Sequence, residues 1–253
     1  MASGMKRDRD GNARPRPVAN APRGRFHDMF EEFRNDLDQH HDRRERIIKA
    51  SRDVTAQSKK MVKRLNEDLP RDIEQDTSSR LAEIDKLLAP IVADMQSLNR
   101  HRYAYQCKGL EEFVEAVSFR HYLRHQTIIT PAETQALLPA GLELTAADYL
   151  YGIFDLFGEM MRFATVTTAQ TGELPGNQEG RNLLGDMQNL GCSFEMLREI
   201  PTKDFRGKME VMRQSVKKVE KLGYGLVVRG SERPKGWVPD LKDDEAPRAV
   251  SPV

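Results

Sequence analysis

Between Phe26 and Leu65, apolar residues recur at alternating intervals of four and three positions, the spacing of one helix face. Twelve positions follow this spacing: Phe26, Phe30, Phe33, Leu37, His40, Arg44, Ile47, Ser51, Val54, Ser58, Met61 and Leu65. Eight of the twelve are apolar, so we expect the stripe to be covered, either by this protein or by a partner. At the rise of an α-helix, about forty residues span roughly 60 Å. Pro70 is expected to end this helix.

A second stripe with helical spacing follows Pro70, at Thr77, Leu81, Ile84, Leu88, Ile91, Met95 and Leu98. Pro90 lies inside it, and we expect the helix to kink or split there because proline lacks the N–H that an inner turn needs. A short connection between two long helices predicts an antiparallel hairpin.

Further helices are predicted by capping signals and apolar periodicity. The stretch from Gly109 to about Thr127 forms one, and Thr130 with Glu133 makes a capping box that begins a short one. Thr145 with Asp148 caps an apolar helix, a helix covers about residues 181–190, and Pro201 opens the last. The stripe of this last helix comprises Phe205, Met209, Met212, Val216, Val219, Gly223 and Leu226. The sequence predicts an all-α fold, a bundle of about seven helices with long antiparallel members.

Both ends of the chain are expected to lie outside this bundle. Residues 1–24 are basic and rich in proline and glycine, with little to bury, so we expect a disordered tail. This tail is either a nuclear-import or loose RNA-contact segment, or a plain solubilising one. Residues 233–253 hold four prolines and form a second, proline-rich tail predicted to be disordered. One helical domain therefore occupies residues 25–232.

Composition limits the functions that the chain can have. The net charge of its 253 residues is +1, so a polyanion would need a local patch to bind. The two cysteines, Cys107 and Cys192, provide no disulfide framework, and a reducing, intracellular setting is expected. No segment approaches eighteen uninterrupted apolar residues, so no membrane span is expected.

Two pairs of acids interrupt helices that are otherwise apolar. Glu112 and Glu115 are three residues apart, and Asp155 and Glu159 are four apart, so each pair shares a helix face. Gly152, one turn before Asp155, leaves space for another backbone or a ligand. Buried carboxylates are costly unless they are paired or hold a metal ion.

These acids have two interpretations. If the helices pack side by side, four carboxylates converge into a site for a hard ion such as Mg²⁺ or Mn²⁺. Neither cysteines nor well-spaced histidines favour zinc, and the Glu-x-x-His motifs of di-iron bundles are missing. Alternatively, the acids form structural ion pairs with Arg120, Arg124 and Arg162.

Four segments of the chain resemble the translin-associated factor X family, a branch of the translin family. They are KASRDVTAQSKK (49–60), GLEEFVEAVSFRHYL (109–123), ADYLYGIFDLFGEMMR (147–162) and SVKKVEKLGYGLVVRGSERPK (215–235). They occur in the order of the family and spread over residues 28–236. The resemblance implies a seven-helix fold that assembles with translin as a hollow hetero-octamer.

The resemblance also implies an activity and its residues. In this family, factor X is a metal-dependent endoribonuclease acting on single-stranded or nicked RNA, such as small-RNA passenger strands and tRNA precursor fragments. Single-stranded DNA binding, and residence in nucleus and cytoplasm, are expected too. The acidic motif falls on Glu112, Glu115, Asp155 and Glu159, a set that translin lacks.

The mechanism expected from this resemblance is Mg²⁺-assisted phosphodiester hydrolysis, with Mn²⁺ as a substitute. Glu115 and Glu159 would bind the metal directly, while Glu112 and Asp155 would complete the site or position water. Arg120, Arg124 and Arg162 could hold phosphates, since guanidinium matches phosphate bidentately. His121 is interpreted as a core histidine. The alternative is an assembly or nucleic-acid-binding partner of translin without catalysis.

Overall fold

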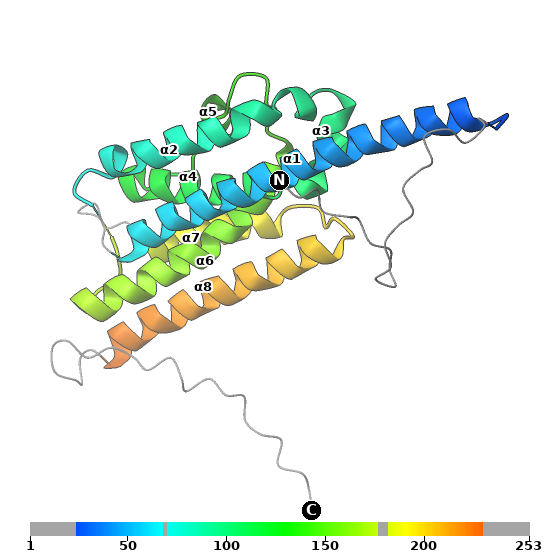
Figure 1. The fold of residues 1–253 in the computed structure, drawn as a ribbon. Helices are drawn as coiled ribbons and strands as arrows, with labels where there is room; N and C mark the ends of the chain where they lie inside the picture. The colour runs from blue at the N-terminus through cyan, green and yellow to red at the C-terminus, as the bar shows by residue number, and fades with distance from the viewer. Residues whose placement is uncertain (1–23, 68–69, 177–181, 230–253) are drawn as a thin grey trace, which may run out of the picture. The chain divides into compact units, whose positions relative to one another are not determined.

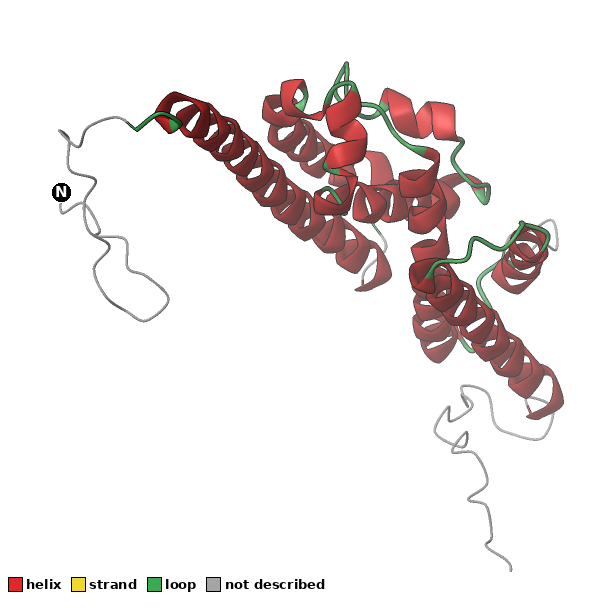
Figure 2. Cartoon of the chain, turned by 90° about the vertical axis from the view of Figure 1, so that its right-hand side faces the viewer, coloured by secondary structure: helices red, strands yellow, loops and turns green. Residues whose placement is uncertain are grey.

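A computed structural model describes residues 24–67, 70–176 and 182–229. Eight α-helices and three short 3₁₀ helices make up this part of the chain (Figure 2), and its only β feature is an isolated bridge between Gly176 and Asn182. The all-α prediction is therefore confirmed, with one more helix than the seven expected, because a short helix follows the second stripe. The predicted tails, residues 1–24 and 233–253, lie outside the described residues except for Gly24. None of the described helices is long and apolar enough to cross a membrane.

Helix α1, His27–Glu67, is the long helix that the first stripe predicted, and it ends before Pro70. The chain divides into two compact units at residues 43 and 44, inside this helix. In the second unit, all stripe positions from Ile47 to Leu65 are buried. In the first unit, the stripe residues Phe26, Phe30, Phe33 and Leu37 are 52–68% exposed. Within the described part of the chain, this end of the stripe is therefore left for a partner to cover.

Helix α2, Ile73–Leu88, lies antiparallel to the part of α1 in the second unit. Arg64 near the end of α1 pairs with Asp76 near the start of α2 at 3.5 Å. Arg46, much earlier in α1, donates to both carboxylate oxygens of Asp94, beyond the end of α2, at 2.8 and 2.9 Å. The predicted hairpin is confirmed.

Pro90 splits the second stripe as expected. The α-helix ends at Leu88, and the chain continues through the 3₁₀ helices η1 (Ala89–Ile91) and η2 (Ala93–Met95), the α-helix α3 (Leu98–Arg102) and the 3₁₀ helix η3 (Ala104–Gln106). The stripe stays buried at Ile84, Leu88, Ile91 and Met95, but Leu98 is 82% exposed. A positive φ of 55° at Ser97 breaks the helical phase there, so the expected core position of Leu98 is wrong.

Helix α6 occupies the centre of the second unit. The remaining helices are α4 (Gly109–His125), α5 (Pro131–Ala136), α6 (Ala146–Thr171), α7 (Leu183–Glu195) and α8 (Lys203–Arg229). Helix α6 packs against α4, α7 and α8, and Figure 1 shows α6 and α8 side by side. Both predicted capping boxes are present, at Thr130 for α5 and at Thr145 for α6.

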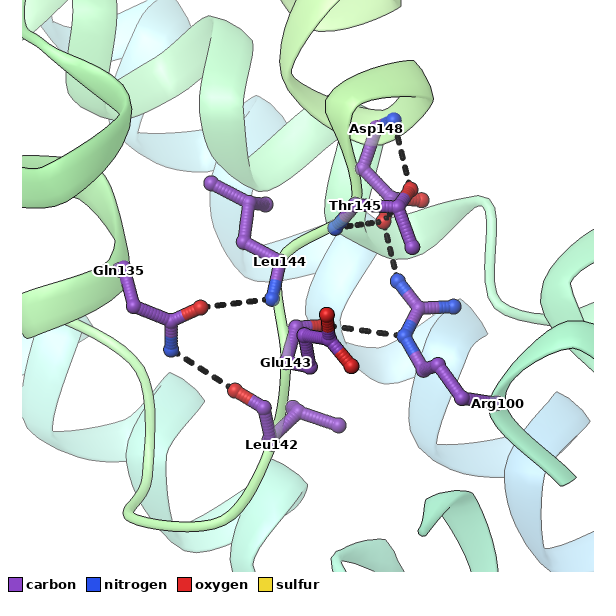
Figure 3. Close-up of polar contacts among 7 residues, drawn as sticks. All are labelled: Arg100, Gln135, Leu142, Glu143, Leu144, Thr145 and Asp148. Atoms are coloured by element: carbon purple, nitrogen blue, oxygen red, sulfur yellow. Dashed lines mark hydrogen bonds and ion pairs between the residues drawn. The ribbon is translucent and has the colours of Figure 1, made fainter. Parts of the chain in front are cut away.

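A buried ion pair fixes the start of α6. Arg100, only 1% exposed, pairs with Asp148 and donates from Nε to the Glu143 carbonyl oxygen at 2.9 Å (Figure 3). Asp148 also accepts from the backbone N–H of Thr145, at 2.9 Å, within the capping box. The incoming loop is held by Gln135, whose side chain bonds the carbonyl of Leu142 and the N–H of Leu144. Arg100 thus sets the position of α6 relative to the preceding loop.

Gly152 lets α6 approach α4 closely. A Cβ atom at this position would lie 2.5 Å from Val114 Cβ and 2.7 Å from the Glu111 carbonyl oxygen. The predicted space beside Gly152 is therefore filled by the neighbouring helix. This contact lies one turn from Asp155 and brings the acid-bearing faces of α4 and α6 together.

Gly152→Ala should destabilise the protein, because the added methyl group must push α4 and α6 apart. We expect a loss of about 1–3 kcal/mol in the free energy of unfolding, typical of overpacking a core. Gly158→Ala on the same helix is the matched control, since nothing lies within 4 Å of its added Cβ. The control should be neutral or slightly stabilising, as alanine favours helix more than glycine does. Urea unfolding of both variants tests this, and equal effects would contradict the close contact.

Candidate functional site

The structure brings the two predicted acidic pairs into one cavity. Glu112 and Glu115 from α4, with Asp155 and Glu159 from α6, line a space of about 600 Å³. Glu115 is the most buried of the four, 9% exposed, and the other three are intermediate. Arg162 of α6 and Lys59 of α1 also line this cavity, which we call the acid cavity. Two helix faces 40 residues apart in sequence thus form one site.

Burial is the main cause of raised pKa values at two of these acids. Burial, followed by the nearby carboxylates of Glu112, Asp155 and Glu159, raises the pKa of Glu115 to about 9. Burial also raises the pKa of Glu159, against the opposing influence of Arg162 and a hydrogen bond from Asn66. The protonated form of Glu115 is therefore favoured in the folded protein, unless a cation joins the cavity.

Lysines neutralise only two of the four acids. Lys59 Nζ lies 3.2 Å from a Glu112 oxygen, and Lys208 Nζ of α8 lies 2.6 Å from Asp155 Oδ2. Within the described part of the chain, Glu115 and Glu159 have no cationic side chain at ion-pair distance. Glu115 and Glu159 are consequently the two acids of the cavity that a bound cation would pair with.

Asn66 orients Glu159 from the neighbouring helix α1. Its buried side chain donates from Nδ2 to Glu159 Oε2 at 2.6 Å. Its Oδ1 is also buried and finds no hydrogen-bond donor among the described residues. Asn66 thus fixes one oxygen of Glu159 and leaves an oxygen acceptor beside it.

Two of the three predicted arginines lie away from the acid cavity. Arg120 and Arg124 both pair with Glu74 of α2, at 3.4 and 2.6 Å, and Arg120 also donates to Thr77 Oγ1 at 2.8 Å. They therefore do not close off the four acids. Only Arg162 lines the acid cavity.

The interpretation of His121 as a core residue is wrong. Its ring is partly exposed, hydrogen-bonded to Thr127 Oγ1 at 3.1 Å, and it lies 4.6 Å from the ring of His125. Helix α4 is ending there, so the stripe that is buried at Leu110, Val114 and Val117 has already reached the surface.

Sequence reasoning missed three residues that contact the acids: Lys59, Asn66 and Lys208. Lys59 and Asn66 flank the buried stripe of α1, and Lys208 precedes the stripe residue Met209 of α8. Each contacts an acid at least 53 residues away in sequence. The only sequence signal for these three residues is that each lies next to a position of a predicted buried stripe.

The donors of the acid cavity fit a hard divalent ion in chemistry and charge. All four acids offer oxygen, the ligand type that Mg²⁺ and Mn²⁺ prefer, and two of them lack a counterion. The four carboxylates of the acid cavity must still move closer together to bind one ion, because no three of these residues have oxygens that all lie within 4.8 Å of one another. Among the described residues, three acidic or histidine ligand atoms within 4.8 Å of one another occur only at His27, Asp28 and Glu31 on the surface of α1.

Known proteins share both the sequence and the fold. The family model described as Translin family matches residues 42–230. Translin-associated protein X of Mus musculus is 29% identical over 241 residues, which cover 84% of this chain and 82% of the mouse protein. The Translin-associated protein X homolog of Schizosaccharomyces pombe is 30% identical over 215 residues, or 81% and 89% of the two chains.

Solved structures agree with the helical architecture. The crystal structure of apo-NeC3PO matches with a TM-score of 0.62 at 16% identity, over 78% of this chain and 96% of that one. The crystal structure of AfC3PO matches with a TM-score of 0.60 at 22% identity, over 81% and 98%. The fold is thus a translin-like helical fold. The chain belongs to the translin family, which confirms the resemblance seen in its sequence.

The pKa of Glu115 predicts how stability depends on pH. A carboxyl group whose pKa rises on folding adds stability below its unfolded value, and that stability is lost as pH rises toward the folded value. For Glu115 this window runs from its ordinary 4.5 to about 9. Without divalent ions, the free energy of unfolding should therefore fall between these pH values, and Glu115→Gln should remove this component.

Urea unfolding of the full-length chain at several pH values measures this effect. Glu83→Gln, on the exposed face of α2, is the control and should keep the pH dependence of the wild type. If Glu115→Gln followed the same pH curve as wild type, Glu115 would not be the buried, repelled carboxyl described above.

Proposed function

We propose that this chain is the catalytic subunit of a metal-dependent endoribonuclease that cleaves single-stranded or nicked RNA. The observation that carries this proposal is the convergence of four carboxylates in one cavity, two of them without a cationic partner among the described residues. Uncompensated buried acids cost stability, and catalytic sites are where such costs are commonly found. The family to which the chain belongs supports the same conclusion.

Mg²⁺, or Mn²⁺ in its place, is the proposed metal. Glu115 and Glu159 would hold it directly, because among the described residues no cationic side chain pairs with them, and Glu112 and Asp155 would complete the site or position water. When bound, a divalent ion activates water and neutralises charge developing on a phosphoryl group. Loss of the Glu115 proton at neutral pH is then expected to accompany metal binding.

The chain's own side chains keep the carboxylates in place. Asn66 orients Glu159, while Lys208 holds Asp155 at 2.6 Å and Glu111 at 3.5 Å. Lys208 Nζ also lies 5.4 Å from the centre of the Tyr151 ring. Its amino group is thus held by Glu111 of α4 and by Asp155 and Tyr151 of α6. Arg162 at the edge of the cavity can bind a substrate phosphate with both guanidinium nitrogens.

Assembly with translin into a hetero-oligomer, and specifically a hetero-octamer, is the second part of the proposal. The names of the relatives, translin-associated protein X and its homolog, support translin as the partner. The first unit of the chain offers a surface for such contact, because Phe26, Phe30, Phe33 and Leu37 form an exposed apolar stripe on α1. We also propose single-stranded DNA binding, and residence in cytoplasm and nucleus.

A second candidate function is a non-catalytic assembly or nucleic-acid-binding subunit of translin. The ion pairs Lys59–Glu112 and Lys208–Asp155 favour it, because they neutralise half of the acid set without a metal ion. The exposed stripe on α1 is equally compatible with it. Glu115 and Glu159 separate the two functions, since a purely structural site has no need for uncompensated acids in a cavity.

Glu115→Ala and Asp155→Ala should abolish RNA cleavage without preventing assembly. Each variant removes one carboxylate from the acid cavity. Neither residue belongs to the exposed apolar stripe of the first unit, which is the surface proposed for assembly. We expect cleavage by the complex with translin in Mg²⁺ to fall at least about 100-fold, the scale for losing one group that stabilises transition-state charge. Size-exclusion chromatography measures assembly, and a labelled single-stranded RNA measures cleavage.

The exposed Glu83→Gln is the control for these variants and should cleave like the wild type. EDTA should stop cleavage in the wild type, and added Mg²⁺ should restore it. A normal rate in either alanine variant would remove the acid cavity from the mechanism and leave the non-catalytic subunit as the better function.

A further inference from the structure

A second cavity of about 560 Å³ adjoins the acid cavity. The two share Glu159 and Arg162 on their common border. Beyond this border, the second cavity is lined by Thr165 of α6 and by Lys218 and Lys221 of α8. We call it the basic cavity, because it collects three cationic side chains and a single acid, which belongs to the acid cavity.

The helices place these side chains on facing surfaces. Arg162 and Thr165 are three residues apart on α6, Lys218 and Lys221 are three apart on α8, and the two helices pack together. Within the described part of the chain, Arg162 and Lys218 make no ion pair with any acid. Their charges are thus available to an outside anion, whereas Lys59 and Lys208 beside the acid cavity are each held by a carboxylate.

The opposite border of the acid cavity has a different character. A cavity of about 460 Å³ shares Glu112 and Asp155 with it and contains Lys108, Lys203 and Lys208. Four acids line it as well: Glu111, Glu112, Asp155 and Asp204. Lys208 is held by Asp155 and Glu111, and Lys108 lies 3.8 Å from Asp204. An anionic strand is therefore attracted to the basic cavity and not to this one.

We propose that the basic cavity is a subsite for the sugar-phosphate backbone of the RNA strand, on one side of the bond to be cut. This inference rests on the proposed function, because it takes the acid cavity as the place of cleavage. Arg162 binds the phosphate nearest the acids with its planar guanidinium, and Lys218 and Lys221 bind the phosphates that follow. The subsite orients the RNA strand, because the cationic side chains bind the phosphates on one side of the bond to be cut and not those on the other side.

Binding of single-stranded RNA to the full-length chain assembled with translin tests the subsite. With EDTA present, cleavage is prevented, and fluorescence anisotropy reports the affinity alone. Lys218→Ala should weaken binding about 3- to 10-fold and reduce the slope of log affinity against log salt by about 1, as expected for one lost phosphate contact. The double variant Lys218→Ala/Lys221→Ala should lose more.

Lys217→Ala is the matched control. Lys217 is the adjacent exposed lysine on α8 but lines a different cavity, together with Glu220 and Arg213. It carries the same charge and is exposed, as Lys218 is. Its replacement should leave affinity and salt slope close to those of the wild type.

Uncharged methylphosphonates in the RNA locate the contact along the strand. Placed one at a time along one side of the mapped cleavage position, they should include one position at which the wild type is weakened and Lys218→Ala is almost unaffected, because that phosphate contact is already lost. Placed on the other side, they should change both proteins equally. An equal response of the two proteins on both sides would overturn the subsite.

The outcomes also separate this inference from the proposed function. If Lys218→Ala bound RNA like Lys217→Ala while the complex cleaved RNA normally, the subsite would be wrong and the nuclease would stand. If the complex bound RNA as predicted but did not cleave it with Mg²⁺, the proposed function would fail and the basic cavity would remain a binding site.

Discussion

The burial of carboxylates between α4 and α6 is the constraint on which the rest of this protein depends. Burial raises the pKa values of Glu115 and Glu159, and for Glu115 the neighbouring carboxylates of the same cavity raise it further. The close packing of α4 on α6 at Gly152 would be lost if the helices moved apart to relieve the cost of this burial. Under the proposed function, a cation in the cavity removes the cost.

The surrounding helices act as a frame for this charge cluster. Arg100 fixes the start of α6 through Asp148, α1 contributes Lys59 and Asn66, and α8 contributes Lys208. Each of these contacts reaches an acid, or the helix that carries it, from a different part of the chain. The long helices therefore do more than form a core, because they pair Glu112 and Asp155 with lysines and leave Glu115 and Glu159 without a cationic partner among the described residues.

Local sequence signals predicted most of this architecture because they act over one or two helical turns. The stripe in α1, the capping boxes at Thr130 and Thr145, and the proline at position 90 each describe a short-range physical preference. The acidic pairs were recognisable for the same reason, since each lies on one helix face. Their common cavity required only that the two apolar helices pack together.

Long-range pairing could not be predicted in this way. Arg120 and Arg124 lie on α4 close to the acids in sequence, yet they pair with Glu74 of α2. Lys208 and Asn66 contact the acids because of how α8 and α1 pack, which no local spacing encodes. The exposed apolar stripe at the start of α1 shows a further limit of prediction from sequence. Helical periodicity identifies an apolar helix face, but it does not identify the surface that covers this face.

Anomalous X-ray diffraction from crystals of the translin complex grown with Mn²⁺ tests the central claim most directly, that the uncompensated acids hold a divalent ion. A peak between Glu115 and Glu159, lost in crystals of Glu115→Gln, is the predicted result. Well-ordered carboxylates in the acid cavity with no peak at saturating Mn²⁺, and Lys59 and Lys208 still paired with Glu112 and Asp155, would contradict it.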